Sequence, residues 1–62
     1  MGVRLKRLRI KRKLTIEELA NELDLSKYLF LYWEMGEITF TIKQLIKVAK
    51  YFNVTTDYLL GL

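Results

Sequence analysis

The chain has 62 residues, with 11 lysines and arginines, 7 aspartates and glutamates, and neither cysteine nor histidine. This length predicts one domain, residues 1–62, which buries roughly 60% of its unfolded surface and leaves little room for a groove that encloses a substrate. The absence of cysteine and histidine excludes disulfides, thiolate metal sites and imidazole catalysis.

The first predicted helix covers residues 3–13, where apolar residues fall on one stripe and cations occupy the other positions. Thr15 and Glu18 then have the spacing of a capping box, in which each side chain bonds a backbone N–H group at the other residue. The box opens a second helix over residues 16–23. We expect its buried stripe to be Leu19, Ala20 and Leu23.

The third predicted helix covers residues 27–35, with Ser26 as its N-cap and Gly36 as the residue that ends it. A fourth helix over residues 42–52 and a short fifth helix over residues 56–60 each follow a threonine suited to an N-cap. The sequence therefore predicts an all-α fold of five helices, without a repeat, a linker or a low-complexity segment.

Charge is unevenly distributed along the chain. Residues 1–13 hold seven cations and no acid, whereas residues 14–40 hold six acids and one lysine. No apolar run reaches the ~20 residues that a membrane span requires, and the N-terminus is too basic for a signal peptide. We therefore expect a cytoplasmic type of domain with no membrane partner, in which the third helix belongs to the acidic part.

Several short motifs follow one another along these helices. They read Leu14-Thr15-x-Glu17-Glu18-Leu19-Ala20, Leu25-Ser26, Trp33-Glu34-x-Gly36, Leu45-x-x-Val48-Ala49 and Val54-x-x-Asp57-x-Leu59-Leu60-Gly61. Together they resemble the lambda-repressor and Cro-like helix-turn-helix domains, the XRE family. The resemblance covers nearly the whole chain and implies a compact five-helix lambda-repressor-like fold. It also implies an internal ion pair between Arg9 and Glu34.

In the family that the chain resembles, the third helix enters the DNA major groove, while the start of helix two and the loop after helix three hold phosphates. One hypothesis is therefore a sequence-specific DNA-binding transcriptional repressor, with Lys27 and Lys43 as its DNA-binding residues. This chain departs from the family pattern at most contact positions. It has Ile16 where glutamine is common, and Met35 where a cation is common.

The outward face of the third helix is apolar. At ~100° per residue, Phe30 and Trp33 share one face, which we expect to be buried. The residues that point away from this face are Tyr28, Leu31, Tyr32 and Met35. A helix in so short a chain cannot bury both faces without a partner. We therefore predict a protein-binding surface that comprises Ile16, Tyr28, Leu29, Leu31, Tyr32, Met35, Ile38 and Phe40.

The hypothesis that this composition favours is a protein-binding module on a helix-turn-helix scaffold, with another protein bound through residues 27–35. Replacement of most contact positions around a retained core is typical of a redesigned surface, so we expect an engineered binder rather than an evolved one. A second version of this hypothesis is a homodimer through the same helix.

An enzyme is the weakest hypothesis for this sequence. Glu17, Glu18 and Glu22 lie near one another on the second predicted helix, but a helix cap and a solvated face explain them. Nothing in the sequence positions a nucleophile or raises the pKa of a carboxylate. We expect no catalysis, no cofactor and no metal site.

Overall fold

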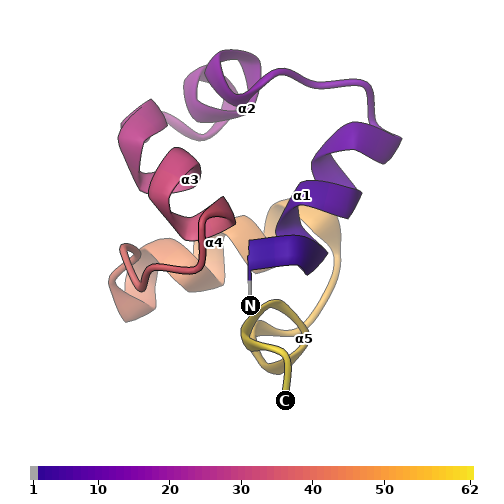
Figure 1. Ribbon diagram of the computed structural model, residues 1–62, viewed down its shortest axis with the longest axis vertical. Coiled ribbons are helices and arrows are strands. Elements are labelled where there is room, and N and C mark those ends of the chain that lie inside the picture. Colours follow the sequence, from indigo (N-terminus) through magenta and orange to yellow (C-terminus); the bar gives the residue numbers. More distant parts are fainter. Residues whose placement is uncertain (1) are drawn as a thin grey trace.

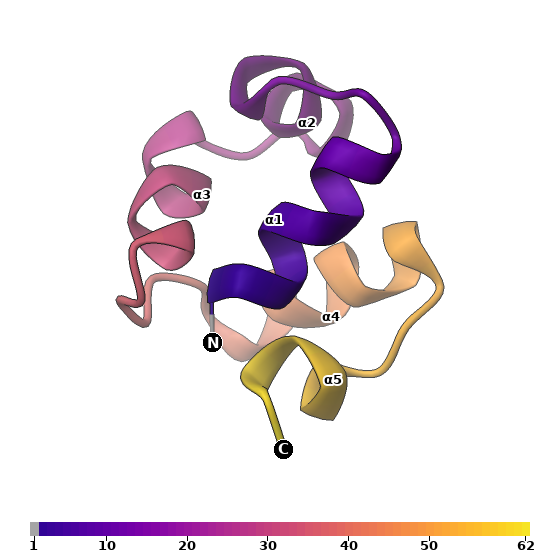
Figure 2. The same ribbon diagram turned by 45° about the vertical axis from the view of Figure 1, so that its right-hand side comes forward.

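The computed structural model describes residues 2–62, which form five helices and no strand. The helices are α1 (Gly2–Lys11), α2 (Ile16–Leu23), α3 (Lys27–Glu34), α4 (Ile42–Phe52) and α5 (Thr56–Leu60). They enclose one core in a body of 26 × 22 × 21 Å, with α1 packed against both α3 and α5 (Figures 1 and 2). The all-α fold predicted from the sequence is confirmed. Met1, which the predicted domain includes, lies outside the described residues.

Reciprocal caps begin two of the helices. At α2, Thr15 Oγ1 accepts from the backbone N–H of Glu18 at 3.1 Å, and Glu18 Oε1 accepts from the backbone N–H of Thr15 at 2.9 Å. At α4, Thr41 and Gln44 exchange the same two bonds at 3.2 and 3.0 Å. The first box and the Thr41 cap agree with the sequence prediction. Both boxes satisfy N–H groups that a helix start otherwise leaves without partners.

Two helix ends differ from the prediction. Residues 3–13 were expected to be helical, but Lys13 has a left-handed backbone with φ of 58°, so α1 ends at Lys11. Likewise α3 ends at Glu34, and Met35 forms its C-cap before Gly36 turns the chain with φ of 97°. A residue in this left-handed region stops the regular helical hydrogen bonding.

The start of α1 lies directly against the end of α3. A Cβ atom on Gly2 would lie 2.6 Å from Cα of Glu34, and it would also overlap the carbonyl oxygen of Trp33. Glycine is therefore required for this close approach of the two backbones. Helix α1 begins at Gly2, one residue earlier than predicted.

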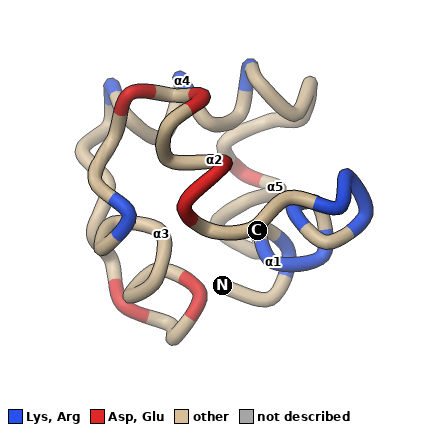
Figure 3. The backbone as a smooth tube through the Cα atoms, turned by 90° about the horizontal axis from the view of Figure 1, so that it is seen from above, with Lys and Arg blue, Asp and Glu red and all other residues tan. Residues whose placement is uncertain are grey.

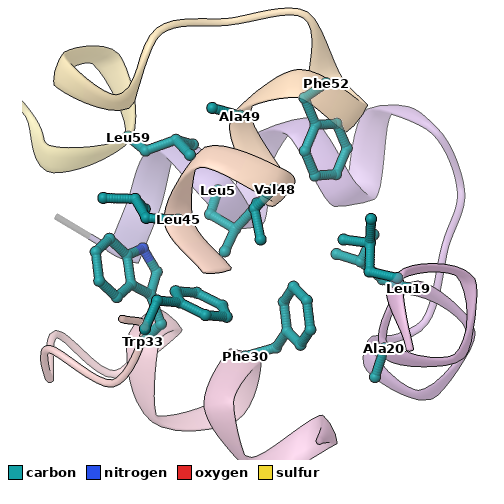
Figure 4. Packing of buried hydrophobic residues seen from close by; sticks show 12 residues of the cluster. Leu5, Leu19, Ala20, Phe30, Trp33, Leu45, Val48, Ala49, Phe52 and Leu59 are labelled. Atoms are coloured by element: carbon teal, nitrogen blue, oxygen red, sulfur yellow. The ribbon is translucent and has the colours of Figure 1, made fainter. Parts of the chain in front are cut away.

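The core lies between α1, α4 and the inward face of α3. Phe30 and Trp33 point from α3 toward Val48 and Leu45 of α4 (Figure 4). The buried side chains are Leu5, Leu19, Ala20, Leu23, Phe30, Trp33, Phe40, Leu45, Val48, Ala49, Phe52 and Leu59. The stripe expected for α2 and the inward pair on α3 are all among them.

Phe40 corrects one prediction, because the sequence placed it on the exposed surface. Its side chain is only 7% exposed, and its ring packs edge-on against Phe30 with centroids 5.0 Å apart. The loop turns it inward: Thr39 Oγ1 donates to the carbonyl oxygen of Leu29 at 2.6 Å, which holds the loop against α3. Ile38, two residues earlier, stays 76% exposed.

An ion pair joins α1 to the end of α3, as the resemblance implied. Arg9 Nε lies 2.7 Å from Glu34 Oε2, and Arg9 Nη2 lies 3.0 Å from Oε1. Arg9 Nη1 also donates to the carbonyl oxygen of Leu14 at 2.8 Å. The two side chains are 13% and 7% exposed. The hydrogen bond to Glu34 raises the pKa of Arg9, against the effect of desolvation, so the guanidinium stays charged.

We expect Phe40→Ala to lower the free energy of unfolding by about 3–5 kcal/mol, because it leaves a cavity beneath α3. Ile38→Ala, in the same loop, is the matched control and changes stability by no more than about 0.5 kcal/mol. Urea denaturation followed by circular dichroism measures both. Phe40→Leu retains most of the volume and gives a smaller loss, which keeps the comparison possible if the alanine variant does not fold. Equal effects of Phe40→Ala and Ile38→Ala would contradict the burial of Phe40.

We expect Glu34→Leu to cost about 1–3 kcal/mol of unfolding free energy, because it leaves the part-buried Arg9 guanidinium without its counter-charge. The double variant Arg9→Met/Glu34→Leu recovers most of this loss, since two apolar side chains replace the pair. Recovery stays incomplete because the carbonyl of Leu14 loses its donor. Denaturant unfolding of the wild type, both single variants and the double variant measures the coupling. Additive losses would show that the pair is not coupled.

Candidate functional site

Helices α2 and α3 lie side by side and are joined by a turn of three residues (Figures 1 and 2). Asp24 adopts a left-handed backbone with φ of 53° and caps the end of α2 through its N–H group. Ser26 then begins α3, and its Oγ accepts from the backbone N–H of Tyr28 at 3.3 Å. The N-cap predicted at Ser26 is confirmed. This tight connection fixes where α3 begins relative to α2.

The outward face of α3 is an exposed apolar surface. We define the α3 surface as Tyr28, Leu31, Tyr32 and Met35. Exposure of these side chains runs from 38% at Leu31 to 69% at Met35, whereas Phe30 and Trp33 on the opposite face are buried. The exposure expected from the helical wheel is therefore observed. The helix is held by one face only, and the other faces outward.

The α3 surface is ordered by contacts among its aromatic rings. The rings of Tyr28 and Tyr32, one helical turn apart, are stacked with centroids 6.5 Å apart and planes 26° apart. Lys27 Nζ lies 5.6 Å from the centroid of the Tyr28 ring, which is a cation–π distance. These contacts limit the rotamers of both tyrosines before any partner binds.

Three residues of the predicted surface are less exposed than the sequence suggested. Ile16 and Leu29 are half-buried and pack against the core, and Phe40 is buried within it. Ile16 is the first residue of α2, and Leu29 lies between the inward and outward faces of α3. A helical wheel alone therefore does not determine whether these two side chains are buried. The predicted residues that are exposed are Tyr28, Leu31, Tyr32, Met35 and Ile38. Their role in binding stays a prediction.

Lys27 is the cation nearest to the α3 surface, and it already has a partner. Its Nζ lies 3.1 Å from Glu17 Oε1 of α2, with both side chains exposed. The hydrogen bond to Glu17 raises the pKa of Lys27, with a further contribution from the charge of Glu17. Solvent screens such an exposed pair, so a competing anion can replace Glu17 at small cost. Lys43, the other predicted DNA-binding residue, is exposed at the start of α4.

The α2–α3 junction has no enclosed pocket. A hollow of about 300 Å³, open to solvent, is lined by Glu17, Ala20, Asn21, Leu25 and Lys27. The capping bonds from Thr15 lower the pKa of Glu18, so this carboxylate is ionised and bound to backbone rather than suited to proton transfer near neutral pH. Within residues 2–62, no three carboxylates are grouped so that they could hold a metal ion.

Part of the basic N-terminal segment has a structural role that the sequence analysis missed. Arg4 donates to the carbonyl oxygen of Tyr58 at 3.1 Å and lies 4.8 Å from the centroid of its ring. Arg12 lies 5.0 Å from the Tyr51 ring and 4.9 Å from the Phe52 ring. The cations of α1 lie on the opposite side of the view from α3 (Figure 3). Arg4 and Arg12 therefore tie the N-terminal segment to α5 and α4 rather than extend the α3 surface.

Two helices, α2 and α3, that pack against each other across a turn of three residues define a helix-turn-helix protein. Residues 2–62 match the family described as helix-turn-helix domain, and the chain belongs to that family. No curated protein and no solved structure gives a significant match. Among the helices of residues 2–62, none combines the length and the apolar composition needed to cross a bilayer.

Proposed function

We propose that this domain binds duplex DNA through α3 and acts as a sequence-specific transcriptional repressor. The observation that carries the proposal is the family match over residues 2–62, together with an α3 that presents one whole face to solvent. In helix-turn-helix proteins the second helix of the motif lies in the major groove, and its N-terminal residues contact base edges. Here that helix is α3, whose N-terminal end carries Lys27 and Tyr28.

The dimensions of α3 suit this placement. Its eight residues give a helix about 12 Å long, and a helix with its side chains is about 10–12 Å wide, close to the ~12 Å width of the major groove. The buried side chains of Phe30 and Trp33 pack α3 against the core, and Arg9 binds the carboxylate of Glu34, the last residue of the helix. The helix can therefore enter a groove without moving away from the core.

Two lysines are placed to contact the phosphates. Lys27 begins α3, and Lys43 lies one residue into α4, after the loop that follows α3. Each cation that neutralises a phosphate releases condensed counterions, which favours binding at low salt. Glu17 opposes this at Lys27, because a phosphate must displace its carboxylate.

We expect the wild-type domain to bind duplexes selected from a random pool, with an affinity that falls as salt rises. Lys27→Ala and Lys43→Ala each weaken binding to all sequences and lower the slope of log affinity against log salt by about 1. Glu17→Gln strengthens binding, because it frees Lys27. Fluorescence anisotropy of a labelled duplex, at salt concentrations from roughly 50 to 200 mM, measures the affinity of the wild type and of the three variants.

Two matched controls separate these effects from net charge. Lys6→Ala on α1 removes the same charge as Lys27→Ala and leaves the affinity nearly unchanged. Glu22→Gln on α2 removes the same charge as Glu17→Gln and has a smaller effect than that variant. Equal losses for Lys6→Ala and Lys27→Ala would contradict a contact at α3. The absence of salt-dependent duplex binding would contradict the proposed function itself.

A second candidate is protein binding, and the exposed apolar α3 surface favours it. Tyrosine, leucine and methionine on one helical face, with Lys27 and Glu17 at the edge, suit the centre and the rim of a protein interface. The partner is either another protein or a second copy of this chain. An origin of this surface by redesign stays a prediction from the sequence.

The homodimer version of the second candidate predicts a dimer at micromolar concentration in sedimentation velocity. Leu31→Asp yields a monomer with an unchanged melting temperature, and Ile10→Asp on α1 leaves the dimer intact. The version with another protein predicts that Leu31→Ala weakens binding of a partner found by screening. Because α3 cannot occupy a groove and a protein interface together, a selected duplex displaces either partner. A monomeric wild type contradicts the homodimer.

A further inference from the structure

The α3 surface has few groups that can form hydrogen bonds with base edges. The side chains of Tyr28 and Tyr32 each carry one hydroxyl group, while those of Leu31 and Met35 carry no N–H or O–H group. The only carboxylate on α3 belongs to Glu34, which Arg9 holds through two bonds at the inner end of the helix. Lys27 is bound to Glu17 at the helix start.

The major groove is read by a known set of pairings. Arginine or lysine binds guanine through two bonds, asparagine or glutamine binds adenine through two bonds, and a carboxylate accepts from cytosine. Thymine differs, because it presents a 5-methyl group that apolar side chains contact. The exposed face of α3 has no arginine, amide or free carboxylate, and its cation is at the end beside α2. Thymine is therefore the base whose edge matches this face.

The spacing of the four side chains fits a short run of base pairs. They occupy one stripe of α3, at intervals of three or four residues, and extend over about 10 Å along the helix. Consecutive base pairs are about 3.4 Å apart, so the stripe covers about three steps. Tyr28 and Tyr32 are stacked on each other, which leaves Leu31 beside them as the flexible aliphatic group.

Resting on the DNA-binding function proposed above, we infer that α3 recognises thymine 5-methyl groups, and hence a thymine-rich segment of the duplex. Leu31 is the central contact, and the stacked pair of Tyr28 and Tyr32 lies beside it. Specificity then comes from apolar burial and from shape rather than from paired hydrogen bonds. The ligand class is a B-form duplex with several thymines within about three base steps.

The test removes only the methyl group. A duplex selected from a random pool is prepared with deoxyuridine in place of single thymines, which keeps base pairing and every hydrogen-bonding group. We expect each replacement at a contacted position to weaken binding about fourfold, the value for burial of one methyl-sized group. Thymines outside the α3 footprint serve as internal controls and show no change. Anisotropy titrations at one fixed salt concentration measure the ratios.

A protein variant then assigns the contact to α3. Leu31→Ala weakens binding to the thymine duplex. When deoxyuridine replaces a contacted thymine, the affinity of this variant falls by a smaller factor than the affinity of the wild type. Ile10→Ala, an equally apolar exposed position on α1, retains the full wild-type ratio. Selected sites in which guanine dominates, or full affinity after replacement, would overturn the thymine inference while DNA binding stands. Absence of salt-dependent duplex binding would overturn both.

Discussion

The guanidinium of Arg9 is the interaction on which the placement of α3 depends. It binds both carboxylate oxygens of Glu34 and the carbonyl oxygen of Leu14, so one side chain joins α1, the segment before α2 and the last residue of α3. Gly2 adds a close backbone approach at the same end. With Ser26 capping the other end, α3 is fixed at both termini. Its outward face is thus presented in one orientation before any partner arrives.

Local rules account for most of what the sequence could predict. Helix stripes and caps depend on residues three or four positions apart, so the inward pair on α3 and the capping box at Thr15 follow from spacing. The burial of Phe40 does not follow from spacing, because a loop residue has no periodicity. It depends instead on the hydrogen bond from Thr39 to α3. The aromatic contacts of Arg12 likewise join residues distant in sequence.

The chemistry of the α3 surface explains why its partner was harder to predict than its exposure. An apolar face by itself favours a protein partner, since bases are usually read by polar groups. The major groove, however, also contains the apolar methyl groups of thymine. Burial of apolar surface at Leu31 can therefore stabilise a complex with DNA as well as one with a protein. Net charge does not predict the partner either, because part of the basic segment forms contacts within the fold, namely Arg4, Arg9 and Arg12. The family match supports the DNA-binding proposal, which periodicity and charge alone do not.

The position of Trp33 gives the molecule an internal optical reporter. It is the chain's one tryptophan, it lies on the inward face of α3, and it is almost completely buried beside Phe40. Its emission therefore depends on whether α3 stays packed on the core. A ligand that docks on the outer face leaves this signal unchanged as long as the helix does not shift. Trp33 therefore reports on the packing of the inner face of α3, while Tyr28 and Tyr32 lie on the outer face and take no part in that packing.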